Sequence, residues 1–133
     1  MWRVLVVDDE ETNCKLITEI LNERALCHVA LSGREAADAF QKAFLNNTPY
    51  DIILLDNAMP VMSGLEVLQE IRRFEAVHDI PLGEGIPIIM VTAFKKDFMK
   101  AFKSGCDDYI LKPIDADKLI SKIEHKVKSA FQA

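Results

Sequence analysis

Two acidic sites in the sequence each come directly after a short apolar run. Asp8 and Asp9 follow Val4–Val7, and Asp56 follows Ile52–Leu55. Carboxylates gathered in one place repel one another, and removing them from water adds a desolvation cost that a cation offsets. Mg²⁺ suits such a set, because it prefers oxygen ligands and binds through one or two carboxylates, phosphate oxygens and water. The alternative is that Asp8 and Asp9 only cap the following helix.

Two further positions supply a hydroxyl and a positive charge. Thr92 ends the apolar run Ile88–Val91, and Lys112 follows Tyr109–Leu111. Carboxylate, metal, hydroxyl and ammonium together describe a site for a transferring phosphoryl group. An ionised aspartate is a competent phosphoryl acceptor when its charge is balanced during attack. The alternatives are that Thr92 is an ordinary β-branched strand end and that Lys112 is an exposed lysine before a turn.

Histidines and cysteines do not form a second chemical site. The three histidines are scattered, and no cysteine lies beside the acidic residues, so zinc fits poorly. The cysteines are odd in number and show no CxxC spacing, which favours reduced, buried thiols over disulfides. The three are Cys14, Cys27 and Cys106.

The segments that must position these residues alternate between short apolar runs and longer amphipathic stretches. This order predicts an α/β fold of the (βα)₅ type, a doubly wound, five-stranded parallel sheet of the flavodoxin-like kind, in one domain over residues 1–133. Ligands of such sheets gather beyond the carboxyl ends of the strands, where all the polar positions above converge. The expected strands are Val4–Val7, Cys27–Ala30, Ile52–Leu55, Ile88–Val91 and Tyr109–Leu111.

Five helices are expected between and after these strands, and Ser32 with Glu35 has the spacing of a capping box. Leu16, Met99 and Phe102 are among the side chains expected on buried helix faces. The stretch from Phe74 to Pro87 is expected to be an irregular loop. The helices are expected over Thr12–Glu23, from Ser32 onward, over Gly64–Phe74 and Lys95–Lys103, and from about Asp115.

Composition excludes several classes of function. The net charge of −5 offers no basic footprint for nucleic acid or an anionic membrane surface. The first apolar run is broken at once by Asp8-Asp9-Glu10, so it is neither a signal-peptide core nor a membrane span. We therefore expect a cytoplasmic protein that binds neither nucleic acid nor membrane.

Four segments together make the chain similar to the receiver domains of response regulators, across nearly its whole length. Each segment alone is weak, but their order and their placement at strand ends are specific. The sequences Gly105-Cys106-Asp107-Asp108-Tyr109 and Glu11-Thr12-Asn13 resemble those of receivers attached to hybrid histidine kinases. The four segments are Val4 to Asp9, Leu54 to Pro60 with Gly64, Val91 to Ala93, and Gly105 to Pro113.

The resemblance implies a role for each site residue. Asp56 would be the phosphorylated nucleophile, and Mg²⁺ would be held by Asp9, by Asp56, by Asp8 through water and by the backbone carbonyl of Ala58. Lys112, Thr92 and the backbone amide of Ala93 would bind the phosphoryl group. Thr92 and Tyr109 would form the switch, and Lys112-Pro113 would be a cis peptide. The phosphodonor would be a histidine kinase or a histidine phosphotransfer protein, and the downstream partner is open.

Three departures from the family pattern carry expectations of their own. The segment from Thr92 to Gly105 is short, so the connection into the fourth helix should be tight or that helix should begin differently. The segment from Phe74 to Pro87 is long, as an added contact or a tolerated insertion. Phe94 either flanks the approach to the phosphoryl group or points into the core beside Phe98.

Other functions remain as alternatives. An aspartyl phosphatase of the haloacid-dehalogenase type also places a nucleophilic aspartate after an apolar strand, but it needs a second carboxylate two residues later, where this chain has Ala58. A flavodoxin-like cofactor binder would need a phosphate-cradling loop after the first strand. A degenerate receiver that only binds proteins is the third alternative. We therefore expect a phosphoacceptor, with at most slow self-dephosphorylation, and not a turnover enzyme.

Overall fold

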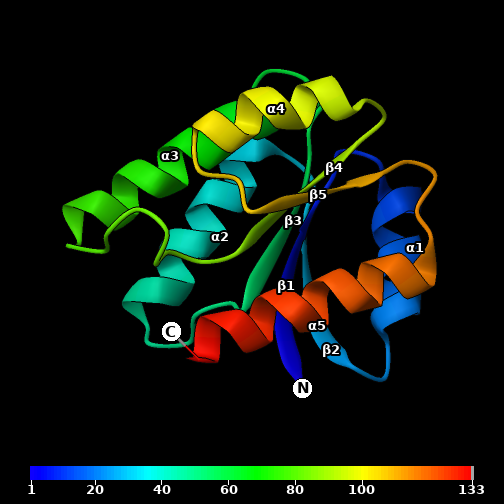
Figure 1. Ribbon diagram of the computed structural model, residues 1–133, viewed down its shortest axis with the longest axis horizontal. Helices are drawn as coiled ribbons and strands as arrows, with labels where there is room; N and C mark the ends of the chain where they lie inside the picture. The colour runs from blue at the N-terminus through cyan, green and yellow to red at the C-terminus, as the bar shows by residue number, and fades with distance from the viewer. Residues whose placement is uncertain (133) are drawn as a thin grey trace.

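A computed structural model describes the backbone of residues 1–132 and the side chains of residues 1–128. Five strands alternate with five helices along the chain (Figure 1), as the sequence predicts. The strands are β1 (Trp2–Val7), β2 (Ala25–Ala30), β3 (Ile52–Asp56), β4 (Ile88–Thr92) and β5 (Asp108–Leu111). The helices are α1 (Glu11–Leu21), α2 (Gly33–Leu45), α3 (Gly64–Val77), α4 (Lys95–Lys103) and α5 (Ala116–Gln132).

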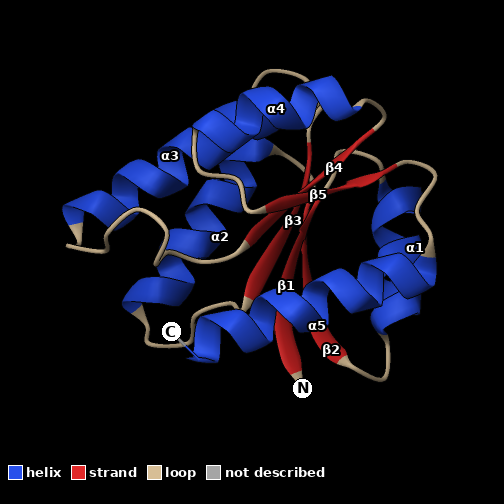
Figure 2. Ribbon diagram, viewed as in Figure 1, coloured by secondary structure: helices blue, strands red, loops and turns tan. Residues whose placement is uncertain are grey.

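The strands form one parallel sheet in the order β2-β1-β3-β4-β5 (Figure 2). Every residue of β3 and β4, two of the three inner strands, is buried, which explains their apolar sequences. The strand order reverses direction after β1. The carboxyl ends of β1 and β3 therefore face a crevice at the point where an open α/β sheet binds its ligands.

Two layers of helices cover the sheet (Figure 1). One core, which contains Phe40, Leu68 and Ala101, lies between the sheet and α2, α3 and α4. The second core, which contains Ile17 and Ile123, lies between the opposite face and α1 and α5. The (βα)₅ doubly wound fold predicted from the sequence is confirmed.

Two of the predicted helix faces are wrong in detail. Leu16 is 46% exposed, because α1 turns Cys14, Ile17 and Leu21 toward the sheet and Leu16 lies about 100° away from Ile17. In α4 the only fully buried side chain is Ala101, while Met99 and Phe102 are 53% and 59% exposed. A helix of only three turns at the end of a sheet buries a narrow strip, so its hydrophobic residues outnumber the buried positions.

Capping explains where the helices of the first layer begin. Ser32 caps α2 by accepting a hydrogen bond from Glu35 N at 3.1 Å, as predicted, but the Glu35 carboxylate accepts from Leu31 N, one residue before the cap. A complete capping box begins α3, where Ser63 Oγ accepts from Glu66 N and the Glu66 carboxylate accepts from Ser63 N. That second box follows the same sequence rule but was not predicted.

The segment expected to be loop from Phe74 onward begins as helix, since α3 continues to Val77. The reason is a buried ion pair on its last turns: Arg72 Nη1 donates to Glu75 Oε1 at 2.7 Å, and Glu75 Oε2 accepts from Ile86 N at 2.7 Å. Arg72 also donates to the carbonyl oxygens of Ile86 and Gly105 and to Asp107 Oδ2. The long connection is therefore tied to α3 and to the entrance of β5.

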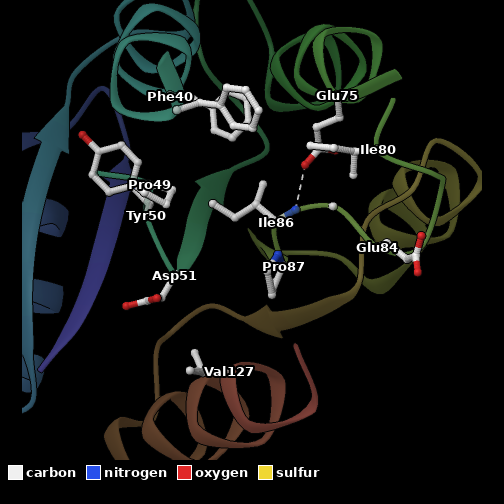
Figure 3. Close-up of a pocket in the computed structure, with 12 residues that line it drawn as sticks. Phe40, Pro49, Tyr50, Asp51, Glu75, Ile80, Glu84, Ile86, Pro87 and Val127 are labelled. Atoms are coloured by element: carbon white, nitrogen blue, oxygen red, sulfur yellow. Dashed lines mark hydrogen bonds between the residues drawn. The ribbon is translucent and has the colours of Figure 1, made fainter. Parts of the chain in front are cut away.

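A cavity of about 240 Å³ lies at the amino end of the sheet, under the long connection (Figure 3). The ring of Phe40 from α2 and the side chain of Ile86 both point toward it, and Tyr50 and Val127 line other walls. The hydrogen bond between Glu75 and Ile86 N closes one side. None of the residues predicted to carry chemistry lines this cavity.

Among the described helices, none has the length and apolar character needed to cross a membrane.

Candidate functional site at the carboxyl end of the sheet

The register of the sheet brings the predicted site residues to one edge. Asp56 is the last residue of β3 and pairs with Val91 of β4, and Thr92 is the last residue of β4. Two backbone bonds beyond the strand ends continue the ladder, from Asp8 N to Ala30 O at 3.2 Å and from Lys112 N to Thr92 O at 2.8 Å. Parallel strands that end at the same level place their first loop residues side by side.

Three carboxylates gather here. Asp8, Asp9 and Asp56 each offer an oxygen, and these oxygens lie within 4.8 Å of one another. Asp8 and Asp56 are buried, whereas Asp9 is exposed. Asp8 Oδ1 accepts a hydrogen bond from Glu10 N at 2.9 Å, but the N-cap of α1 is Glu10, and no side chain caps it. The interpretation that Asp8 and Asp9 only cap the helix therefore explains one bond and leaves the cluster unexplained.

A lysine from the far strand reaches this cluster. Lys112 Nζ donates to Asp56 Oδ1 at 3.0 Å, and the Lys112-Pro113 peptide after β5 is cis. The Asp56 side chain is only 4% exposed, and that of Lys112 is 32% exposed. The interpretation of Lys112 as a solvent-exposed lysine is wrong, because its ammonium is directed into the site.

The electrostatics of Asp56 reflect a deficit of positive charge. Burial raises the pKa of the Asp56 carboxyl above its ordinary value, and the charge of Asp8 adds to the rise. Lys112 and the backbone of Ala58 oppose the rise through hydrogen bonds but do not cancel it. Burial lowers the pKa of Lys112, yet its bond to Asp56 and the charge of Asp8 outweigh burial, so the net shift is upward.

This donor set fits a small, hard cation. All the converging side-chain ligands are carboxylate oxygens, which Mg²⁺ prefers, and the exposed Asp9 leaves one side open for the waters that Mg²⁺ retains. A divalent ion would also offset the burial of the Asp56 charge and its repulsion from Asp8, which together raise the pKa of Asp56. Ala58 is exposed in the loop two residues after Asp56. A β-carbon at Gly64 would overlap the Asp56 carbonyl oxygen, so the start of α3 packs directly on the end of β3.

Thr92 lies in the site but its hydroxyl is engaged elsewhere. Thr92 is 2% exposed, and its Oγ1 accepts from Phe94 N and has two acceptors within reach of its single proton, Phe94 O at 3.2 Å and Asp97 Oδ2 at 3.4 Å. No hydrogen bond between Thr92 and Asp56 occurs in the described part of the chain. Asp97, in the first turn of α4, was not predicted as a site residue. Its place in the first turn of the helix that follows a site threonine is the signal that was available.

The connection from β4 to α4 is tight, as the short segment predicts. Only Ala93 and Phe94 separate Thr92 from Lys95, and Ala93 is exposed. Phe94 is 61% exposed, and Lys96 Nζ lies 5.6 Å from its ring centre. The alternative in which Phe94 enters the core beside Phe98 is wrong, because Phe94 is the extended N-cap residue of α4 and its side chain faces solvent.

Tyr109 is half-buried on β5, next to α4 rather than inside the carboxylate cluster. Its ring centre lies 4.6 Å from that of Phe98, and the ammonium of Lys122 lies 5.4 Å from the Tyr109 ring. Lys122 also pairs with Asp108 at 3.0 Å. The structure thus places one candidate switch residue at the site and the other on the surface between α4 and α5.

Comparison with known proteins agrees with this geometry. The sequence profile of the response regulator receiver domain matches residues 4–124. Hybrid signal transduction histidine kinase I of Dictyostelium discoideum is 39% identical over 128 residues, which cover 94% of this chain and 7% of that protein. The transcriptional regulatory protein RprY of Bacteroides fragilis is 36% identical over 124 residues, 92% of this chain and 48% of RprY.

Solved structures show the same likeness. A receiver domain protein of Clostridium thermocellum has a TM-score of 0.81 at 25% identity over 97% of this chain and 96% of that one. The receiver domain of the Francisella response regulator 1452 has a TM-score of 0.77 at 30% identity, with 97% and 98% covered. This chain spans less than a tenth of the hybrid kinases that it matches. The fold, the strand-end residues and these relatives together place the chain in the family of response regulator receiver domains of two-component signalling.

Proposed function

We propose that the chain accepts a phosphoryl group on Asp56 from the phosphohistidine of a histidine kinase or a histidine phosphotransfer protein. One observation carries the proposal: a buried carboxylate lies between two other carboxylates and a lysine that donates to it at 3.0 Å. A buried carboxylate that faces other carboxylates costs folding free energy, and carboxylates perturbed in this way cluster at functional sites. The likeness to receivers of hybrid kinases supports a histidine-containing donor.

In the proposed reaction, an Asp56 carboxylate oxygen attacks phosphorus in line with the phosphorus–nitrogen bond of the donor. A new oxygen–phosphorus bond forms an acyl phosphate, and the electron pair of the broken bond returns to the imidazole nitrogen. Lys112 keeps one Asp56 oxygen oriented and then neutralises charge on the transferred group. The backbone amide of Ala93, an exposed residue, would donate a hydrogen bond to a phosphoryl oxygen.

The metal ligands in this proposal are Asp8, Asp9, Asp56 and the backbone carbonyl of Ala58. Asp9 is the exposed member and would bind directly, whereas Asp8, already bonded to Glu10 N, would act through water. When bound, Mg²⁺ supplies charge that stabilises the attacking carboxylate and the equatorial phosphoryl oxygens together.

Thr92 and Tyr109 would transmit the change. The Thr92 hydroxyl is held by Phe94 O and Asp97, and a phosphoryl oxygen on Asp56 would compete for its proton. A turn of Thr92 toward Asp56 releases the beginning of α4 and leaves space that Tyr109 fills. Such a switch needs contacts that differ between two states, and the Thr92 hydroxyl provides them.

The test is phosphorylation by phosphoramidate, a small donor with a phosphorus–nitrogen bond, followed by intact mass. We expect one phosphoryl group per chain with Mg²⁺, none with EDTA and none in Asp56→Asn. Asp38→Asn, an exposed carboxylate on α2, is the matched control and should label fully. Labelling of Asp56→Asn would remove Asp56 from the mechanism, and an unlabelled native chain would leave a receiver that only binds proteins.

Backbone carbon and nitrogen chemical shifts of the phosphorylated chain test the switch separately. We expect the changes to extend from Thr92 through Pro113, with the largest at Phe94 and Asp97, because their bonds to Thr92 are lost. Changes confined to the neighbours of Asp56 would contradict the switch while leaving phosphoryl transfer intact.

A further inference from the structure

The strand β2 forms one edge of the sheet and has a free side. It pairs with β1 over all its residues, and the strand order places nothing beyond it. The opposite edge strand, β5, has only four residues, whereas β2 has six. An edge strand presents unpaired backbone donors and acceptors, which makes it a template for another strand.

The hydrogen-bond phase of the β1–β2 pair identifies the free groups. Trp2 N donates to Arg24 O and Asp8 N donates to Ala30 O, so the even-numbered residues of β2 face β1. The N–H and C=O groups of Ala25, Cys27 and Val29 must then point outward. Within residues 1–132, no hydrogen-bond partner is described for them. Leu31 N, the next outward donor, is satisfied by Glu35.

The side chains of this strand do not protect the edge. Ala25–Ala30 contains no Lys, Arg, Asp, Glu or Pro, which are the residues that natural edges use to prevent pairing. Leu26 is 53% exposed and Val29 is 40% exposed. β2 is therefore an open, uncharged edge with apolar side chains on both faces.

We propose that β2 is a self-association surface, on which a second copy of this chain pairs antiparallel through its own β2. A twofold axis at Cys27 sets Cys27 opposite Cys27 of the second copy and Ala25 opposite Val29. All the outward groups of these three residues are then satisfied, in about six backbone hydrogen bonds. The same register sets Leu26 opposite His28, and both side chains are exposed.

The helix beside this edge agrees with a twofold pair. α1 contacts both β1 and β2, so two copies of α1 would lie roughly 10 Å apart across the axis, a normal helix-packing distance. The side of α1 that borders β2 carries Lys15 and Glu19, next to a groove of about 400 Å³ that Val29 also lines. In an antiparallel helix pair Lys15 of one copy meets Glu19 of the other, so the charges are complementary.

A second copy explains these features better than an unrelated peptide. The outward N–H and C=O groups of one β2 pair with those of a second β2 without a bulge. On α1, Lys15 and Glu19 of one copy face Glu19 and Lys15 of the other. The contact is small, so we infer a weak dimer that forms with rising concentration rather than an obligate one. This association does not involve Asp56 or Lys112.

The first experiment is sedimentation equilibrium of the chain from about 10 μM to about 1 mM, a range that captures weak association. We expect a monomer–dimer equilibrium in the native chain. The double variant Leu26→Lys, His28→Lys places lysines opposite one another in both cross-strand pairs and should weaken the dimer by at least about tenfold. Leu111→Lys, the same change on the other edge strand, is the control and should leave the dimer unchanged.

Charge reversal makes the test specific to the register. Mixing the double-lysine variant with a Leu26→Glu, His28→Glu variant should restore association as a heterodimer, because each lysine then faces a glutamate. Mild oxidation of the native chain with diamide should join two chains through Cys27, since opposed Cα atoms about 5.5 Å apart lie within disulfide reach. Cys14 and Cys106 are buried and should remain reduced.

A native chain that stays monomeric at about 1 mM would overturn the proposal. A dimer that Leu111→Lys disrupts and the double-lysine variant does not would overturn it as well. Asp56→Asn should dimerise like the native chain. Loss of phosphorylation and loss of the β2 contact are therefore separate results.

Discussion

The two ends of the sheet both hold buried charge, but they treat it in opposite ways. At the amino end, Arg72 lies between Glu75 and Asp107 and uses all its donor groups. Two of these groups donate to Gly105 O. At the carboxyl end, three carboxylates gather, and the ammonium of Lys112 bonds to one of them, Asp56. Glu75 and Asp107 at the amino end each accept hydrogen bonds from the guanidinium and from a backbone N–H, whereas, among the described side chains, only one of the three carboxylates at the carboxyl end bonds to a cationic side chain.

The difference separates a structural role from a functional one. A completed network holds the long connection and the entrance of β5 in place, and it has little to gain from a ligand. A cluster of like charges costs folding free energy, and a bound cation can recover it. Removing a charged side chain should therefore lower the free energy of unfolding at the amino end and raise it at the carboxyl end.

The largest expected effect is at the amino end. Arg72→Ala leaves the Glu75 carboxylate, whose side chain is 4% exposed, without its charged partner and should lower the free energy of unfolding by about 3–5 kcal/mol. Urea denaturation measures this. Arg34→Ala, which removes the ion pairs of a 55% exposed arginine with Asp38 and Glu70, is the control and should change little. Equal small losses in both variants would show that the Arg72 network is not what holds this end together.

A smaller effect of opposite sign is expected at the carboxyl end. Asp9→Ala should raise the free energy of unfolding in EDTA by on the order of 0.5 kcal/mol, because repulsion is relieved but Asp9 is exposed and screened. With Mg²⁺ the native chain should gain stability by mass action and the variant should gain less. Thermal unfolding with and without Mg²⁺ measures both. Equal stabilisation of the two proteins by Mg²⁺ would exclude Asp9 as a ligand.

The smallest expected effect is on the pKa values of two buried thiols, Cys14 and Cys106, and on the stability that depends on them. Burial raises the pKa of Cys14 to about 11, with a further rise from Asp8, and burial raises that of Cys106 to about 11. An unfolded thiol ionises near the ordinary value of 9.0, so the folded state holds protons that the unfolded state loses. Stability present below pH 9 is thus lost as the pH rises toward 11.

Asp8→Asn should lower the pKa of Cys14 and leave that of Cys106 unchanged, because only Cys14 borders the acidic cluster. The carbon chemical shifts of the two cysteines, followed by NMR from pH 8 to pH 12, give both values. The lowered pKa should also reduce the loss of stability above pH 9. If the pKa values of both thiols fall in Asp8→Asn, the cause is a change in packing and not the loss of the local charge.

Periodicity along the chain was enough to predict the alternation of strands and helices and the edge at which the polar residues meet. Buried parallel strands are continuous apolar runs, and whatever follows such a run lies at the carboxyl edge. Asp8, Asp56, Thr92 and Lys112 could therefore be grouped before any contact was known. The prediction of which helix face is buried was less accurate, as the exposed Leu16 and Phe102 show, because short helices have more apolar residues than buried positions.

What the sequence by itself determined is the chemistry available at one edge: three carboxylates, a hydroxyl and an ammonium at the ends of neighbouring strands. Tertiary structure decided how these groups and the rest of the charges are paired. The contacts of Lys112 with Asp56, of Arg72 with Gly105 and Asp107, and the free side of β2 all depend on strand order and on loops that bring distant residues together. Local pattern specifies an element and its end, but side-chain partners more than 30 residues apart are set only when the sheet has formed.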